Sequence, residues 1–208
     1  FVENKRKYGY PQRFSVQNTK NSTEASYNIQ KLLVENELDQ GVLLAFQSLH
    51  MPTLKAIKRA NIKLETFYEL QKRFTKQGVK TFSDLILGLP LETYDSFTKG
   101  VSELIERGQH NKIQFNNLSI LPNAPIVEDR EKYGLETKFS KVINIHGSLD
   151  ETEEIREEQE VVISTNTMNR EDWIKTRTFA YNCLFTHFNK TLQIPNILAN
   201  LYGGKSYR

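Results

Sequence analysis

Apolar and polar residues form alternating blocks along the first 125 residues, and these blocks predict strands and helices in turn. Apolar positions spaced for one buried helical face predict helices at 24–35, 51–61, 64–77 and 96–107. Shorter apolar runs predict strands at 13–19, 42–49, 81–87 and 112–121. Strands that alternate with helices form right-handed crossovers, so the pattern predicts an α/β fold with a parallel sheet, either open or curled into a partial barrel.

The pattern changes after Pro125, and we divide the chain there into a domain at 1–125 and a C-terminal extension at 126–208. The extension mixes helix with short strands. We expect a polar helical segment at 127–134, a strand around 142–145, an acidic helix or loop at 150–160, an edge strand at 161–164, a helix at 169–189 and a frayed tail at 200–208.

Composition excludes some classes of function. The chain has 208 residues, 38% of them apolar, and a formal net charge of +3, which is too small to indicate a nucleic-acid partner. No apolar run is long enough to span a bilayer and no signal-peptide pattern opens the chain. We therefore expect no membrane association and a cytoplasmic location.

The cysteine count excludes one kind of metal centre. Cys183 is the only cysteine, so the chain forms no internal disulfide. A [4Fe–4S] cluster needs three or four thiolate ligands, which this chain cannot supply. Cys183 lies in an apolar helical stretch and is interpreted as a small buried hydrophobe. The acidic run at 150–160 is interpreted as solvated, so we predict no metal site within the chain.

Three polar residues lie at or just beyond the predicted carboxyl ends of strands. Gln47 ends one apolar run, Asp84 lies within the next, and Arg59 follows Gln47 by twelve residues. The carboxamide and the carboxylate can bond hydroxyl groups, and the guanidinium can bind a carboxylate with two hydrogen bonds. Taken singly, each residue also fits an ordinary role as a capping glutamine, a surface arginine or a solvated aspartate. Gly88 follows the strand and would let a ligand approach the backbone.

Two segments resemble signatures of the radical SAM superfamily. Asp84-Leu-Ile-Leu-Gly-Leu-Pro-x-Glu-Thr is similar to the fifth-strand motif of that family, and Leu44-Ala-Phe-Gln-Ser-Leu-(x)4-Leu-(x)2-Ile-x-Arg is similar to its fourth strand and helix. The resemblance is strong over about 14–125, looser over 161–198, and closest to members that carry a cobalamin-binding domain ahead of the barrel. It implies a partial parallel (β/α) barrel, a fragment of a TIM-like barrel.

The resemblance also implies a site for S-adenosylmethionine. Gln47 and Asp84 would contact the ribose, Arg59 would bind the methionine carboxylate, and the backbone at Ile86 would pack against the adenine. The glycine turn at Gly88 would hold the adenosine. Gln17 occupies the place where many members carry a polar or acidic cofactor ligand. The 112–125 segment resembles the sixth strand, whose backbone lines the adenine pocket.

The chain departs from the family in two places. Leu91 replaces a common glycine in the turn, and the cluster-binding cysteine triad is absent together with the strand that carries it. We therefore expect a C-terminal part of a longer enzyme, inactive alone, whose N-terminal remainder supplies the [4Fe–4S] ligands and any cobalamin domain. The whole enzyme would cleave S-adenosylmethionine reductively and use the 5′-deoxyadenosyl radical. The substrate and the catalytic residues stay unknown, and a non-catalytic α/β binding module is the alternative.

Overall fold

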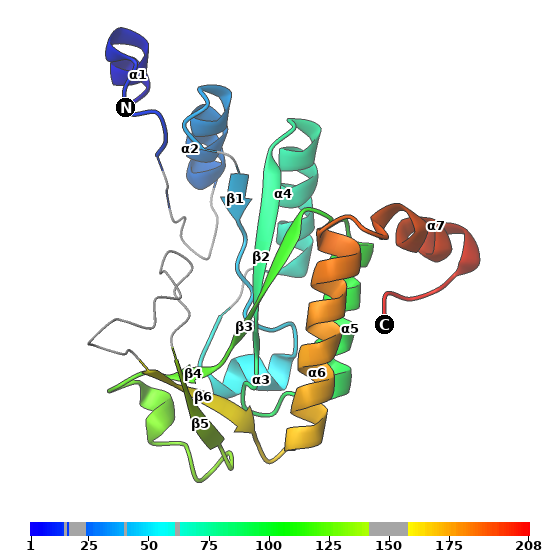
Figure 1. The fold of residues 1–208 in the computed structure, drawn as a ribbon. Helices are drawn as coiled ribbons and strands as arrows, with labels where there is room; N and C mark the ends of the chain where they lie inside the picture. The colour runs from blue at the N-terminus through cyan, green and yellow to red at the C-terminus, as the bar shows by residue number, and fades with distance from the viewer. Residues whose placement is uncertain (15, 17–23, 40, 61–62, 142–157) are drawn as a thin grey trace.

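The computed structural model describes residues 1–14, 16, 24–39, 41–60, 63–141 and 158–208 (Figure 1). The elements, in chain order, are α1 (Val2–Tyr8), α2 (Glu24–Glu35), β1 (Gly41–Leu43), α3 (Met51–Ala56), α4 (Leu64–Lys76), β2 (Lys80–Leu87), α5 (Tyr94–Glu106), β3 (Lys112–Asn117), β4 (Ser119–Ile120), the 3-10 turn η1 (Pro125–Val127), β5 (Glu136–Lys141), β6 (Glu158–Ser164), α6 (Arg170–Cys183), the π-helical turn η2 (Leu184–Phe188) and α7 (Gln193–Gly203).

A parallel sheet in the order β1-β2-β3 lies at the centre of the molecule. Val42 pairs with Thr81 in the first interface, and Asp84 pairs with Gln114 in the second. The predicted α/β class, strand order and strand direction are confirmed for these strands. The predicted strand at 13–19 falls largely outside the described residues, and closure into a partial barrel stays a prediction.

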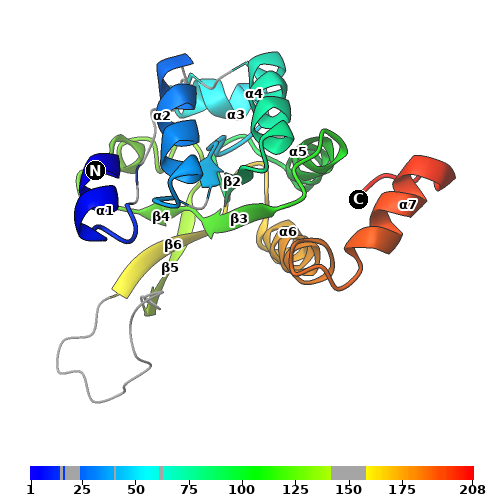
Figure 2. The same ribbon diagram turned by 90° about the horizontal axis from the view of Figure 1, so that it is seen from above.

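Helices cover one face of this sheet. Alternate residues of β2 from Thr81 to Leu87 are buried, while those between them are half-buried. Figures 1 and 2 show α4 and α5 along the covered side, with α6 next to β3. The side chains of this core are mostly aliphatic and aromatic: Tyr27, Val42, Leu44, Phe46, Phe67, Leu70, Phe74, Val79, Leu85, Leu87, Phe97, Val101, Leu104, Ile105, Ile113, Met168, Ala180, Cys183 and Phe188. Their burial supplies the main stabilisation of the fold.

Helix α5 begins near the predicted residue because the sequence carries its capping groups. Thr93 accepts a hydrogen bond from Ser96 N at 3.1 Å, and the Ser96 hydroxyl accepts one from Thr93 N at 2.9 Å. This reciprocal capping box opens α5 two residues before the predicted start. The helix predicted at 51–61 is shorter, because α3 ends at Ala56 and Lys58 takes a left-handed φ of 52°.

A second sheet, antiparallel and in the order β4-β6-β5, adjoins the carboxyl end of the first. Leu118 links the two, since its N–H donates to Leu87 O at 2.8 Å and its carbonyl accepts from Val162 N at 2.9 Å. The prediction of an edge strand at 161–164 is wrong, because β4 and β5 pair with both sides of β6. The strand predicted at 142–145 lies outside the described residues. Val127 ends the 3-10 turn η1, and residues 128–134 form turns rather than the predicted helical segment.

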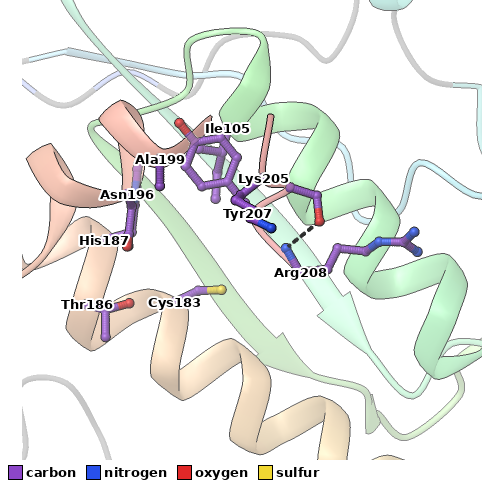
Figure 3. Close-up of a pocket in the computed structure, with 10 residues that line it drawn as sticks. Ile105, Cys183, Thr186, His187, Asn196, Ala199, Lys205, Tyr207 and Arg208 are labelled. Carbon is purple, nitrogen blue, oxygen red and sulfur yellow. Dashed lines mark hydrogen bonds between the residues drawn. The ribbon is translucent and has the colours of Figure 1, made fainter. Parts of the chain in front are cut away.

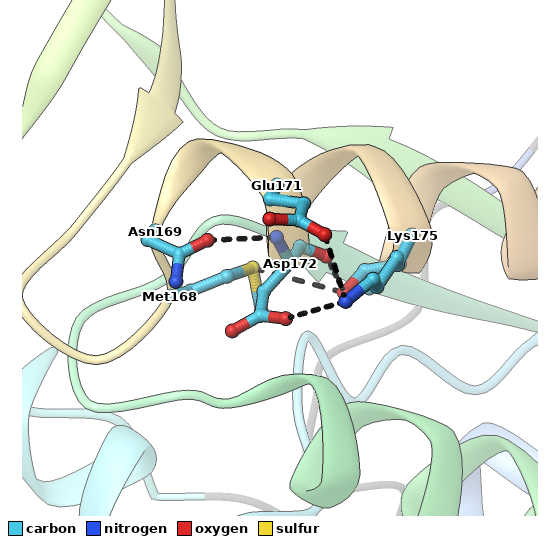
Figure 4. A network of polar contacts seen from close by, with 6 residues as sticks. Met168, Asn169, Glu171, Asp172 and Lys175 are labelled. Atoms are coloured by element: carbon cyan, nitrogen blue, oxygen red, sulfur yellow. Dashed lines mark hydrogen bonds and ion pairs between the residues drawn. The ribbon is translucent and has the colours of Figure 1, made fainter.

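Helix α6 returns along the first sheet and confirms the helix predicted at 169–189. The Asn169 side chain caps it by accepting from Asp172 N at 2.9 Å, and Lys175 lies close to both Glu171 and Asp172 (Figure 4). Ala180 and Phe188 join the core of the parallel sheet. Residues on both sides of position 125 thus share one core, and the domain boundary there stays a prediction.

The C-terminal tail, expected to be frayed at 200–208, is helical up to Gly203 and has no regular secondary structure beyond it, but it contacts the core through Tyr207. Helix α7 continues to Gly203, and the Tyr207 backbone N–H donates to the Ser102 hydroxyl at 3.3 Å. Tyr207 packs against the main core, 105 residues away from its hydrogen-bond partner. Across the described portion of the chain, every helix is too short or too polar to cross a membrane.

Candidate functional site

The backbone brings Gln47 directly beside the strand that carries Asp84. Gln47 N donates to Asp84 O at 2.9 Å, and Ile86 N donates to Gln47 O at 2.8 Å. Phe46 N also approaches Asp84 O at 3.3 Å, so two successive residues face one carbonyl. This bulge coincides with a left-handed φ of 65° at Gln47. Gln47, Asp84 and Ile86 are therefore neighbours, as predicted.

Asp84 does not lie at the end of its strand, where we expected it. It lies inside β2, three residues before Leu87, on the face that the helices leave half-buried. The strand ends at Leu87, as predicted, and Leu85, Ile86 and Leu87 continue the parallel pairing with β3 beyond Asp84. The site is thus centred on the open face of the sheet rather than on its rim.

Arg59 reaches the same region from beyond α3. Its side-chain Nη2 donates to Ala45 O at 3.2 Å, which places the guanidinium against the chain segment that ends in Gln47. Arg59 lies past the end of the helix on which we predicted it, since that helix stops at Ala56. The structure places the Arg59 guanidinium near enough to Asp84 for their charges to interact, and the Gln47 backbone pairs with Asp84.

The two charged groups of this set are partly withdrawn from water. Burial raises the pKa of Asp84, while the charges of Lys112 and Arg59 oppose that rise. Burial lowers the pKa of Arg59, and the Asp84 carboxylate opposes that change. The two opposite charges stabilise each other's ionised form. Because both groups are partly withdrawn from water, each also attracts an opposite charge on a ligand more strongly than it would in solvent.

Strand β3 adds polar groups that the sequence analysis did not single out. Register pairs Phe82 with Lys112 and Asp84 with Gln114, and the same face continues with Asn116. Gln114 donates to the Asn116 side chain at 3.2 Å. Polar residues at every second position of β3 were the signal that could have revealed this face.

A groove of about 460 Å³ runs between β3 and α6. The strand lines it with Lys112, Gln114 and Asn116, and the helix lines it with Arg177 and Tyr181. Its lining contains two cationic side chains and several amides, so it can accept polar and anionic groups of a ligand.

Gly88 has a structural reason for being glycine. Its φ is 90°, which a residue with a Cβ rarely adopts. An added Cβ would make ordinary van der Waals contacts with Val162 O at 3.6 Å and Trp173 Nε1 at 3.7 Å, so the backbone conformation rather than a lack of space favours glycine. Leu91, which stands where the family motif has glycine, also takes a positive φ of 62°. A role for Gly88 in cofactor binding stays a prediction, and Gln17 lies outside the described residues.

The surroundings of Cys183 are unsuitable for a metal ligand. It is buried among apolar side chains, and burial raises the pKa of its thiol to about 12. Within the described ranges, no group of three His, Cys, Asp or Glu side chains could hold a metal ion. The residues present therefore do not fit a [4Fe–4S] cluster.

Comparison with known proteins identifies relatives for most of the chain. No family model matches it. It is 36% identical over 182 residues to the cobalamin-dependent radical SAM methyltransferase TokK of Streptomyces tokunonensis, which covers 86% of this chain. The 2-(S-pantetheinyl)-carbapenam-3-carboxylate methyltransferase of Streptantibioticus cattleyicolor gives the same identity and coverage. The resemblance to the radical SAM superfamily is confirmed.

The relatives are enzymes, and the chain spans only about a quarter of their length, 26% in each case. The radical SAM methyltransferase TsrM of Kitasatospora setae has a similar fold, with a TM-score of 0.52 at 13% identity over 77% of this chain and 34% of that one. That likeness supports the fold assignment alone. The roles of Gln47, Arg59, Asp84, Ile86 and Gly88 toward a cofactor stay predictions.

We expect this 208-residue chain to bind no iron after anaerobic reconstitution with iron and sulfide. Its one thiol, on Cys183, is buried and holds its proton, whereas cluster ligands are thiolates. Iron analysis and the visible absorption spectrum provide the measurement, with Cys183→Ala as the control. Stoichiometric iron that is lost in Cys183→Ala would contradict the prediction.

Proposed function

We propose that this chain supplies the S-adenosylmethionine-binding part of a radical SAM enzyme that transfers methyl groups. The observation that supports the proposal is the backbone pairing of Gln47 with Asp84, together with an Arg59 guanidinium that bonds Ala45 O and whose charge acts on Asp84, in a chain similar to radical SAM methyltransferases. The [4Fe–4S] ligands and a cobalamin-binding domain would come from the remainder of the protein. The substrate class is open, and a cytoplasmic location stays a prediction from the sequence.

The chain's own residues fit the chemistry of S-adenosylmethionine. This molecule carries ribose hydroxyls, a carboxylate and cationic centres, so it needs hydrogen-bond acceptors, a cation and an acid within one cleft. Asp84 and Gln47 can accept from the hydroxyls, and Arg59 can bind the carboxylate with two hydrogen bonds. When bound next to a cluster, S-adenosylmethionine would supply the radical chemistry. The Ile86 backbone, held by Gln47 O, would present an ordered edge to the adenine.

Substitution of Arg59 and Asp84 tests this site. In the full-length protein, Arg59→Ala and Asp84→Asn should each weaken S-adenosylmethionine binding by roughly ten- to a hundredfold, the effect of losing a charged hydrogen bond worth about 1.5–3 kcal/mol. Calorimetry measures the affinity, and the iron content shows that the cluster is retained. Arg73→Ala removes an exposed arginine that pairs with Glu24 and serves as the control. Unchanged affinity in both site variants would refute the assignment.

A non-catalytic α/β module with the same pocket is the alternative, and the buried Cys183 is the observation that favours it. The coding sequence upstream of Phe1 separates the two. A Cys-x3-Cys-x2-Cys loop encoded there supports the enzyme, whereas its absence supports the binding module.

A further inference from the structure

Glu92 is a buried acid in the turn between β2 and α5, and the proposed site makes no use of it. Only 1% of its surface is exposed. Its Oε1 accepts a hydrogen bond from the Ser48 hydroxyl at 2.6 Å, from 44 residues earlier in the chain. Its backbone carbonyl accepts another from the Thr167 hydroxyl at 2.8 Å. Glu92 thus joins the ends of two strands to the turn before α6.

Ser48 is the residue that follows the strained bulge at Gln47. Its hydroxyl also accepts from His50 N at 3.0 Å, so the segment between Gln47 and α3 is organised around this one side chain. A non-glycine residue at a φ of 65° persists only where surrounding contacts hold it there. On its strand side, Gln47 is held by Asp84 O and Ile86 N, and on its other side the next side chain is held by Glu92.

The second carboxyl oxygen of Glu92 favours the protonated acid. Oε2 is buried and has no hydrogen-bond partner among the described residues. Burial raises the pKa of Glu92 to about 8, against a smaller opposing effect of the Ser48 hydrogen bond. A neutral carboxyl can bond Ser48 without the desolvation cost of a buried charge.

We propose that Glu92 is a positioning residue that holds the Gln47 bulge in its left-handed conformation through Ser48. The bulge sets where the Gln47 side chain and the Ile86 backbone lie on the open face of the sheet. The consequence for cofactor binding rests on the proposed function, while the effect on the bulge does not. A purely structural role, in which Glu92 only satisfies Ser48, would leave the bulge unchanged when Glu92 is replaced.

Amide hydrogen exchange, followed by NMR on the 208-residue chain, tests the effect on the bulge. In Glu92→Ala and Ser48→Ala, the Gln47 and Ile86 amides should exchange about three- to tenfold faster, as expected for weakening one buried hydrogen bond. Glu92→Gln keeps an acceptor for Ser48 and should restore slow exchange. If Glu92→Ala does not fold, Ser48→Ala, which removes one hydroxyl, still decides the question.

Ser83→Ala is the matched control. Ser83 is also buried on β2, and its hydroxyl accepts from Gln109 Nε2 at 2.8 Å, away from the bulge. Its loss should leave the exchange of Gln47 relative to the other β2 amides unchanged. Exchange that rises uniformly in Glu92→Ala, as in Ser83→Ala, or that does not rise at all, would overturn the proposal.

Binding of S-adenosylmethionine to the full-length protein then tests the consequence. Glu92→Ala should weaken binding as much as Gln47→Ala does, and Glu92→Gln should bind like the unsubstituted protein. If Glu92→Ala loosens the bulge but binds as tightly as the unsubstituted protein, the positioning role toward the cofactor is overturned. If the unsubstituted protein binds no S-adenosylmethionine, the proposed function fails, and the exchange data alone decide the role of Glu92.

Discussion

At pH 8 the Glu92→Gln variant of this chain is expected to be more stable than the unsubstituted protein, and at pH 4.5 this advantage should be absent. The reason is the burial that raises the pKa of Glu92 from its ordinary 4.5 to about 8. Below pH 4.5 the acid is protonated in both the folded and the unfolded chain. Between pH 4.5 and 8 the unfolded chain releases a proton that the folded chain keeps, so the free energy of unfolding falls as pH rises.

The expected slope is about 1.4 kcal/mol per pH unit, and the full loss by pH 8 is on the order of 4 kcal/mol. Glutamine keeps the acceptor for Ser48 but cannot ionise, so Glu92→Gln should lack this decline. Urea unfolding followed by fluorescence of Trp173, the one tryptophan, measures the free energy at each pH. Glu106→Gln is the control, because Glu106 also accepts a serine hydroxyl, at 2.9 Å, but lies closer to the surface. Equal slopes in Glu92→Gln and the unsubstituted protein would contradict the prediction.

The role of Glu92 also shows where sequence reasoning reaches its limit. The Gly-Leu-Pro-Leu-Glu-Thr turn was recognisable, and so was the helix that follows it, because its apolar residues are spaced for one buried face. The burial of Glu92 and its partner Ser48 come from packing across 44 residues. No local pattern specifies such a contact.

The parallel sheet illustrates the same division. Strands β2 and β3 were predictable from apolar runs that end at glycine and proline turns. The shortening of β1 was not predictable, because it depends on two successive amides that face one Asp84 carbonyl. The central place of β6 was missed for a similar reason, since its partners β4 and β5 come from separate segments of the chain.

The roles of the candidate site residues stay predictions, but part of their spatial arrangement can be compared with the structure. Gln47, Arg59 and Asp84 were chosen for their chemistry and for a family resemblance; the fold pairs the Gln47 and Asp84 backbones and holds the Arg59 guanidinium against Ala45 O. The prediction for the 112–125 segment concerned its backbone alone, so it did not include the polar side chains of Lys112, Gln114 and Asn116. Their place on the open face follows from their register with β2, which only the folded structure reveals.

His187 should give the opposite dependence on pH. This side chain is 2% exposed in the π-helical turn η2 that follows α6, and its Nε2 lies 3.1 Å from His110 Nδ1. Its Nδ1 is buried and has no hydrogen-bond partner among the described residues. Burial, and secondarily the charge that His110 can carry, lowers the pKa of His187 from 6.5 to about 4. The folded chain therefore binds fewer protons than the unfolded chain between pH 4 and 6.5.

The contribution of neutral His187 to the free energy of unfolding is fully present above pH 6.5, and it is lost as the pH falls through 4. The expected slope is again about 1.4 kcal/mol per pH unit, and the total is roughly 3 kcal/mol. Figure 3 shows His187 among the residues that line a pocket of about 320 Å³ together with Tyr207, whose ring meets the imidazole edge-on at 5.4 Å. Protonation should therefore weaken the docking of the C-terminal tail as well as the core.

The effects of Glu92 and His187 on the pH dependence of the free energy of unfolding can be separated because they have opposite signs. Between pH 4.5 and 6.5 the contributions of Glu92 and His187 to the free energy of unfolding have opposite signs, and the lowered pKa of His110 acts in the same direction as that of His187. Glu92→Gln should expose the rise of stability with pH that His187 causes, and His187→Gln should expose the decline that Glu92 causes. NMR titration of the His187 ring provides the direct measurement. The prediction would be contradicted if the His187 imidazole titrated near pH 6.5. It would also be contradicted if the free energy of unfolding of the Glu92→Gln variant stayed constant from pH 4.5 to 6.5.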